Sequence, residues 1–266
     1  MTLIVSLRIP DGIVIAGDSL ATMMADVNVQ ADVNVTCPNC GHQHIISGAP
    51  VAHLNLPSTT YSYAQKVFPF LDEYGVGTSG AGQLVGKTIY FAIRELEQEL
   101  RSSGKIPNGV LAVADAIGSR AHELLKEQVT DIDNAPDNWA AVGFQVVGYE
   151  GRTATTVVLD IGKGIKKHVA DKQGCTRTGQ GHVVDAIWAL YKQRPADQAQ
   201  YSNFSLQDAI AYAEFLISTT AAYQRFSRTI PQVGGDIDIA LVTPFDKFKW
   251  IKQKHLSQVI GGHNEQ

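Results

Sequence analysis

The second residue of the chain could by itself supply both parts of a nucleophilic catalyst. Thr2 is small enough for the preceding Met1 to be removed, and removal would leave a free α-amine beside the threonine hydroxyl. An α-amine with a pKa of ~8 can accept the hydroxyl proton at neutral pH. Thr2 could then attack a carbonyl carbon. The alternative is that Thr2 is an ordinary second residue without a chemical role.

Two cysteines three positions apart form a second group that could do chemistry. In the stretch VNVTCPNCGHQHII, Cys37 and Cys40 have the spacing of a zinc knuckle, in which a tight turn presents two thiolates to one tetrahedral ion. His42 and His44 follow closely and could complete a Cys₂His₂ set, with His53 in reserve. The sequence therefore predicts a zinc site in this stretch.

Other interpretations of these cysteines stay open. A full zinc site normally takes its second pair of ligands from a separate segment, and the one further cysteine is Cys175. The site could be completed by a neighbouring subunit, the two thiols could be a redox pair, or the knuckle could hold no metal. A bound zinc would be structural and would stiffen a flap. We expect no cofactor for catalysis.

The composition excludes several classes of protein. The net charge of −4 and the even spread of Lys and Arg disfavour a nucleic-acid surface. No apolar run approaches the ~18 residues of a membrane span. Arg8, Pro10 and Asp11 interrupt the first apolar stretch too early for a signal peptide. The cysteine usage indicates a reducing compartment, so we expect a cytoplasmic protein without nucleic-acid or membrane partners.

Apolar periodicity predicts the elements that must position these residues. Two short apolar runs, 3–9 and 13–17, flank a Pro-Asp-Gly turn and predict a hairpin. Ser205, with Asp208 three residues later, is typical of the start of a helix. Further strands are expected near 62–70, 74–79, 139–149, 153–161, 165–170 and 236–243. Helices are expected over 85–100, 110–124, 182–193 and 206–224.

This order of elements predicts an α+β fold. Strands, two helices, strands, two helices and a last strand fit a four-layer αββα sandwich, with two stacked antiparallel sheets and helices on both outer faces. We expect one domain over 1–254 with an inserted Cys/His flap at 23–60, and a polar C-terminal tail over 255–266.

The opening string TLIVSLRIPDGIVIAGDSLAT resembles the start of proteasome β-subunits and of their bacterial double-ring relatives, the N-terminal-nucleophile hydrolases. The similarity covers the scaffold apart from the insertion. The first residue of the family's mature chain is its nucleophile and matches Thr2. A buried aspartate sixteen residues later matches Asp18. KVFPF resembles the family's lysine strand, with Lys66 as the lysine, and the oxyanion glycine fourteen residues further on matches Gly80.

The resemblance implies a catalytic role for each matched residue. The ammonium of Lys66 would favour the threonine alkoxide and lower the pKa of the α-amine, and Asp18 would hold that lysine charged. The backbone N–H of Gly80, at the N-terminal end of a helix, would meet the developing oxyanion, where removal of one donor costs ~3 kcal/mol of barrier.

The chain departs from the family in its C-terminal half. In TGQGHVVDAI, Gln180 stands where the family has a serine that supports the terminal threonine. Near VGGDIDIALV, Ile230 and Val233 fall where the family has an aspartate and a serine. Two polar partners are therefore missing, and glutamine cannot be assumed to do the task of the serine.

Substrate contacts follow only from the same resemblance. Thr22 matches the residue whose backbone pairs with the bound peptide. The residues that match the lining of the first specificity pocket are all small, which predicts a roomy pocket: Ala21, Ala64, Thr78 and Gly82.

Taken with the resemblance, these residues predict a proteasome-like threonine-type endopeptidase. Thr2, exposed by removal of Met1, would attack a peptide amide through an acyl-enzyme. The expected partners are other copies of the chain in a homo-oligomeric double ring, a peptide or unfolded-protein substrate, and an ATPase. One alternative is an amidase or peptide ligase that acts on one defined substrate. The other is a catalytically silent ring subunit that binds a partner through the zinc flap.

Overall fold

The computed structural model describes residues 2–228 and 230–254 and divides into two compact units. The smaller unit is Thr22–Tyr61, and the larger unit is built from the described residues on either side of it. The tail expected over 255–266 lies outside the described residues.

The first sheet of the larger unit contains the predicted N-terminal hairpin. Its strand order is β12-β1-β2-β13-β14, and every neighbouring pair is antiparallel. The strands are β1 (Leu3–Ile9), β2 (Gly12–Asp18), β12 (Gly174–Gly179), β13 (Ile237–Thr243) and β14 (Lys247–Lys252). All residues of β1 and β2 are buried, because both faces of this sheet are covered.

The second sheet stacks on the first. Its order is β11-β10-β9-β6-β5, again antiparallel throughout. The strands are β5 (Val67–Phe70), β6 (Tyr74–Gly80), β9 (Ala140–Glu150), β10 (Thr153–Gly162) and β11 (Ile165–Ala170). Ile4, Ile15, Val67 and Val147 belong to the apolar cluster in which residues of both sheets pack together.

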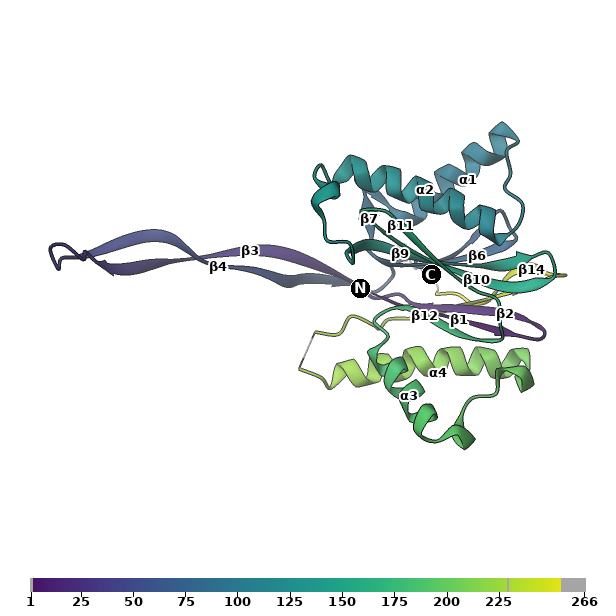
Figure 1. The fold of residues 1–266 in the computed structure, drawn as a ribbon. Coiled ribbons are helices and arrows are strands. Elements are labelled where there is room, and N and C mark those ends of the chain that lie inside the picture. Colours follow the sequence, from purple (N-terminus) through teal and green to yellow (C-terminus); the bar gives the residue numbers. More distant parts are fainter. Residues whose placement is uncertain (1, 229, 255–266) are drawn as a thin grey trace, which may run out of the picture. The chain divides into compact units, whose positions relative to one another are not determined.

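Helices cover both outer faces, as Figure 1 shows, and this confirms the predicted αββα sandwich. α1 (Ile89–Ser103) and α2 (Val110–Gln128) pack on the second sheet. α3 (His182–Gln193) and α4 (Leu206–Arg225) pack on the first. Ser205 and Asp208 form the predicted cap of α4, with side-chain to backbone bonds in both directions. In the part of the chain that is described, no helix has the length and apolar character of a membrane span.

Two predicted boundaries are wrong. The helix expected from residue 85 begins at Ile89, because 83–88 form a small hairpin with Val85 and Gly86 in the left-handed region. Its strands are β7 (Gln83–Leu84) and β8 (Lys87–Thr88). Residues 62–66 do not extend β5, because the N–H of Ala64 donates to the carbonyl of Ser19, 3.0 Å away.

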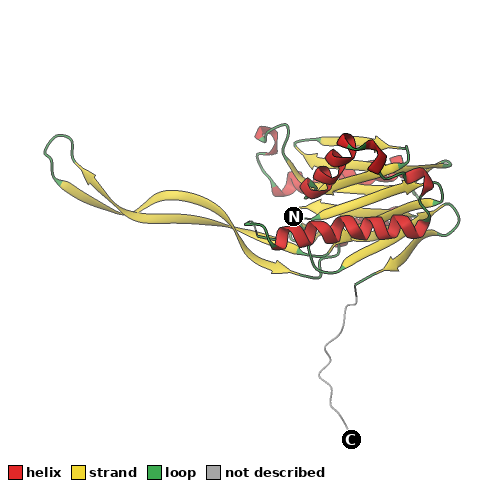
Figure 2. Ribbon diagram, turned by 90° about the horizontal axis from the view of Figure 1, so that it is seen from below, coloured by secondary structure: helices red, strands yellow, loops and turns green. Residues whose placement is uncertain are grey.

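The smaller unit is a long antiparallel ribbon. β3 (Ala21–Thr36) has 16 residues and β4 (Gln43–Tyr61) has 19, so each strand is ~50 Å or more in length. Figure 2 shows the two strands twisting about one another. The segment expected as a Cys/His flap is therefore a hairpin, with the cysteines in the turn at its tip.

Candidate active site

The carboxylate of Asp18 is the centre of a buried polar cluster. Asp18 ends β2 and is 1% exposed. Its oxygens accept hydrogen bonds from the backbone N–H groups of Leu3 (2.9 Å), Leu20 (3.2 Å) and Gly234 (3.1 Å). Leu3 directly follows Thr2, so this carboxylate fixes the backbone beside the predicted nucleophile.

Lys66 forms an ion pair with the same carboxylate. Its Nζ lies 3.1 Å from both oxygens of Asp18 and also donates to the carbonyl of Leu20. The carbonyl of Lys66 accepts from the N–H of Thr78 at 2.9 Å, which fixes the lysine to β6. The structure thus brings together Asp18 and Lys66, which lie 48 positions apart in the sequence.

Burial is the main influence on both ionisable groups. It lowers the pKa of Lys66 from its ordinary 10.5, and the negative charge of Asp18 opposes this effect. Burial also raises the pKa of Asp18, whereas the ammonium of Lys66 and the backbone N–H donors lower it. The pair therefore carries a lysine that loses its proton more readily than one at the surface.

Thr2 is 4% exposed and is held by the end of β12. Its carbonyl accepts from the backbone N–H of Gln180 at 2.7 Å. A Cβ atom at Gly179 would lie 1.8 Å from that carbonyl oxygen and 3.4 Å from the Cβ of Ser79. Gln180 therefore contacts Thr2 through its main chain, an interaction that does not depend on which side chain stands there.

Gly80 ends β6, next to the buried Ser79. Its φ of +89° favours glycine, and a Cβ would lie 2.5 Å from the carbonyl oxygen of Ala141. The helix expected to begin here is absent, because α1 starts only at Ile89, after the β7–β8 hairpin. A helix dipole therefore does not assist at Gly80, and any oxyanion stabilisation has to come from local N–H groups.

The loop before β13 supports Asp18 with its backbone. The carbonyl of Gly234 accepts from the N–H groups of Ser19 (3.1 Å) and Leu20 (2.9 Å), and its own N–H donates to Asp18. Gly235 has a φ of +72°, and a Cβ there would lie 2.6 Å from the hydroxyl of Ser19. No role was expected for these two glycines, although a Gly-Gly pair permits a close approach of the backbone.

The two positions that lack the family's polar residues differ in environment. Val233 is 1% exposed and packs in the core of the first sheet, whereas Ile230 is 48% exposed. The side-chain oxygen of Gln224, at the end of α4, accepts from the N–H groups of Gln232 (2.7 Å) and Val233 (3.0 Å). This segment is thus held by a buried glutamine and an apolar anchor.

A second buried Lys–Asp pair lies near the first. Lys254 donates from its N–H to Asp238 at 2.8 Å and from its ammonium to the same carboxylate, and both side chains are nearly inaccessible. Asp238 pairs with Gly17 in the sheet, next to Asp18. The charge of Lys254 contributes to lowering the pKa of Lys66. No motif in the sequence indicated this pair.

Two of the predicted pocket residues are tied to the backbone around Asp18 and Lys66. Ala64 bonds to Ser19, and Thr78 bonds to Lys66 through its N–H. Within the described chain, the buried hydroxyl of Thr78 has no hydrogen-bond partner. Ala21 is half-buried, Gly82 is exposed at the start of the β7–β8 hairpin, and Thr22 is the first residue of the smaller unit. The pocket these residues would form stays a prediction.

The predicted metal ligands lie in the smaller unit. Cys37 is half-buried and Cys40 is exposed, at the tip of the hairpin. The side chains of His44 and His53 lie outside the description, and among the described residues no three His, Cys, Asp or Glu side chains are grouped as a metal site. Cys175 lies in the larger unit, where burial raises the pKa of its thiol to about 12.

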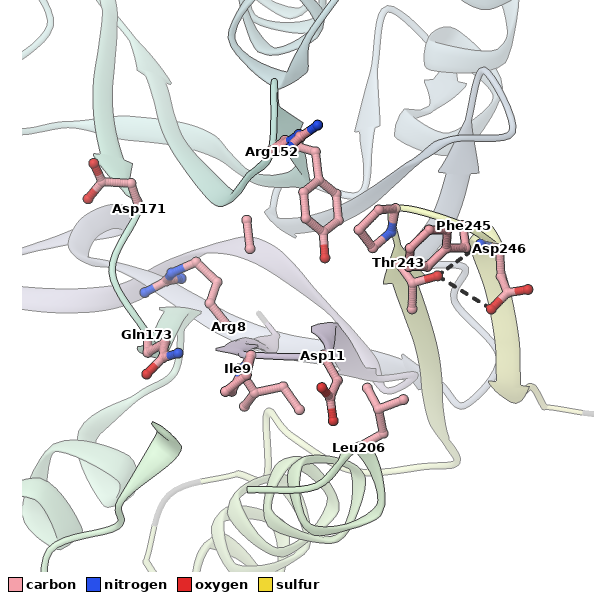
Figure 3. A pocket seen from close by; sticks show the side chains of 14 residues that line it. Arg8, Ile9, Asp11, Arg152, Asp171, Gln173, Leu206, Thr243, Phe245 and Asp246 are labelled. Atoms are coloured by element: carbon pink, nitrogen blue, oxygen red, sulfur yellow. Dashed lines mark hydrogen bonds between the residues drawn. The ribbon is translucent and has the colours of Figure 1, made fainter. Parts of the chain in front are cut away.

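A cavity of about 570 Å³ lies at the opposite end of β1 from Thr2. Figure 3 shows Arg8, Asp11, Arg152 and Asp171 around it. The guanidinium of Arg8 donates to the hydroxyls of Thr156 and Thr176, at 2.8 Å each. The seven residues of β1 put this cavity ~20 Å from Thr2, so it is not part of the Asp18–Lys66 site.

The αββα sandwich has a counterpart among solved structures, and the likeness is one of fold. Among solved structures, the chain is similar to a Gly-1 mutant of Anbu from Hyphomicrobium sp. strain MC1, with a TM-score of 0.56 and 14% sequence identity. That match covers 96% of this chain and 86% of the other. No protein-family model and no curated protein matches the chain.

Proposed function

We propose that the chain is a threonine peptidase in which Thr2, after removal of Met1, is the nucleophile. The observation that carries this proposal is the Asp18 carboxylate, which accepts from the N–H of Leu3 and at the same time holds the ammonium of Lys66. One buried anion thus orients the residue after the nucleophile and keeps a cation beside it, which is the arrangement that nucleophile activation requires.

The reaction has two steps. The α-amine of Thr2 accepts the hydroxyl proton while the hydroxyl oxygen attacks the peptide carbonyl carbon, and the ammonium of Lys66 stabilises the developing negative charge. The N–H of Gly80 would donate to the carbonyl oxygen as it gains charge. The proton then passes to the leaving amine, which leaves an ester on Thr2, and water hydrolyses that ester.

The resemblance of the opening string to that of the double-ring hydrolases motivates a proposal on assembly. We propose a homo-oligomeric double ring that acts on peptides or unfolded chains, with an ATPase as a partner. The apolar Ile230 and Val233 favour one alternative, a ring subunit without catalytic activity. An amidase or peptide ligase of the same nucleophile class would share every residue named above and would differ in the acceptor of the acyl group.

The intact mass of the purified chain, with and without a peptide α′,β′-epoxyketone, tests the nucleophile. Such an inhibitor bridges a hydroxyl and an adjacent free α-amine, so we expect loss of Met1 and a single adduct. The Thr2→Ala variant keeps the amine but lacks the hydroxyl, and should take no adduct. A retained Met1, or a processed Thr2 without adduct, would point to the silent subunit. An adduct together with transfer of the acyl group to an amine in preference to water would indicate a ligase.

The rate of peptide hydrolysis is expected to fall as the pH rises, and the fall should begin below the ordinary pKa of a lysine. Burial lowers the pKa of Lys66 from 10.5, so its ammonium is lost earlier as the pH rises. On the acid side the rate is expected to rise as the α-amine of Thr2 loses its proton, and an ordinary α-amine does so with a pKa of ~8. A profile of kcat/KM against pH measures both limits.

The charge of Lys254 provides a check that the alkaline limit belongs to Lys66. Because that charge lowers the pKa of Lys66, the Lys254→Met variant should move the alkaline limit to higher pH. An alkaline limit that does not move in this variant, or one at or above 10.5 in the unmodified protein, would assign the limit to another group.

A further inference from the structure

The tip of the hairpin is a closed turn built around Cys37. The N–H of Cys37 donates to the carbonyl of His42 (2.8 Å), and the N–H of Gly41 donates to the carbonyl of Cys37 (2.9 Å). Gly41 has a φ of +72°, a conformation that favours glycine, and a Cβ there would meet nothing within 4 Å. The chain therefore reverses direction over these six residues with its own backbone bonds and fixes the spacing of the two cysteines.

Hydrogen-bond donors of the turn surround one of the two sulfurs. The N–H groups of Asn39 and Cys40 and the thiol of Cys40 are directed at the sulfur of Cys37. Thiolates are the form in which cysteines bind zinc, and N–H groups directed at the sulfur are the outer contacts that such ligands use.

The described part of one tip groups fewer ligands than the ion needs. A structural zinc takes four ligands in a tetrahedron, most often with several thiolates. Among the described side chains, no third His, Cys, Asp or Glu is grouped with the two cysteines as a metal site. The Nδ1 of His42 lies 3.3 Å from the carbonyl oxygen of Cys40, within its own loop. Two tips would supply four sulfurs.

The surroundings of the turn suit a second copy of the same chain. The stretch 33–46 contains no Asp, Glu, Lys or Arg, so two identical tips meet without repulsion between like charges. Val35 and Ile45 flank the turn and are 41% and 68% exposed.

We propose that the hairpin tips of two copies of this chain bind one zinc ion through Cys37 and Cys40 of each copy, and that this Cys₄ site joins the two protomers. The site does not involve Thr2, Asp18 or Lys66, so it stands or falls independently of the peptidase proposal.

Zinc content and assembly size of the full-length protein test the site. Purified with zinc and measured by elemental analysis and native mass spectrometry, the protein should carry one zinc for every two chains. X-ray absorption at the zinc edge should show four sulfur ligands at ~2.3 Å. Removal of the metal with a chelator should lower the mass of the assembly, and added zinc should restore it.

Two matched double variants separate the alternatives. Cys37→Ser with Cys40→Ser should lose the zinc and the larger assembly, whereas His42→Ala with His44→Ala should keep both. One zinc per chain, with nitrogen in the coordination sphere and loss of metal in the histidine variant, would overturn the proposal in favour of a Cys₂His₂ site within one copy. A protein that binds no metal when zinc is supplied, with its thiols either reduced or joined in a disulfide, would also overturn the proposal. Circular dichroism shows whether each variant keeps the sandwich.

Discussion

Replacement of Lys66 by methionine is expected to lower kcat for peptide hydrolysis by ~10³-fold or more, the range seen when a residue that activates a nucleophile is removed. Methionine has a similar volume but no charge, so the alkoxide of Thr2 would lose its cation. Asp18 would keep its three backbone N–H donors, so the backbone of Leu3 should stay in place. Single-turnover rates on a fluorogenic peptide, expressed per folded protein, measure the effect.

The control is Lys254→Met, because it breaks a similarly buried ion pair whose carboxylate lies on the same sheet as Asp18. Loss of one partner from a buried pair costs about 3–5 kcal/mol of stability. Urea unfolding should therefore show a similar loss in both variants, while kcat should fall by orders of magnitude only in Lys66→Met. Equal loss of activity in the two variants would mean that Lys66 acts through stability and not through the nucleophile.

The parts of the fold that depend on local patterns could be predicted from the sequence. The hairpin of β1 and β2 follows from two apolar runs around a Pro-Asp-Gly turn, and the start of α4 follows from Ser205 and Asp208. Four amphipathic helices and the order of elements were enough for the sandwich, because each sheet needs an apolar cover on its outer face.

The elements that were missed depend on distant partners. β12 and β14 have few buried residues and mixed polar sequences, and they are strands because β1 and β13 offer them edges. The helix start at Gly80 was wrong because Val85 and Gly86 turn the chain first. Spacing alone does not show such a turn, since a residue such as valine rarely takes a positive φ.

The candidate site likewise contains residues that a sequence pattern reveals and residues that only the fold brings together. Asp18 and Lys66 could be found because their spacing follows a known family pattern, and the structure pairs them. The sequence does not reveal the contacts of four further residues: Gly234, Gln224, Asp238 and Lys254. Some of these contacts are made by backbone atoms, which leave no mark in the sequence. The others join side chains that only the fold brings together. Backbone donors around a carboxylate are set by the fold and not by residue type.

The substitution Gly179→Ala is expected to displace the nucleophile Thr2, and its effect on the rate is the second large one that we predict. The new Cβ would lie 1.8 Å from the carbonyl oxygen of Thr2, and the φ of +81° adds ~1–2 kcal/mol for a residue other than glycine. Thr2 would have to move, and a displacement of about 1 Å at a reacting group can cost ~10²-fold in rate.

Gly151→Ala is the matched control, because its φ of +61° is also positive but nothing lies within 4 Å of its Cβ position. We expect the control to lose only ~1–2 kcal/mol in urea unfolding and to keep its rate of epoxyketone labelling. A Gly179→Ala protein that labels as fast as the control would show that the close contact between β12 and Thr2 does not position the nucleophile.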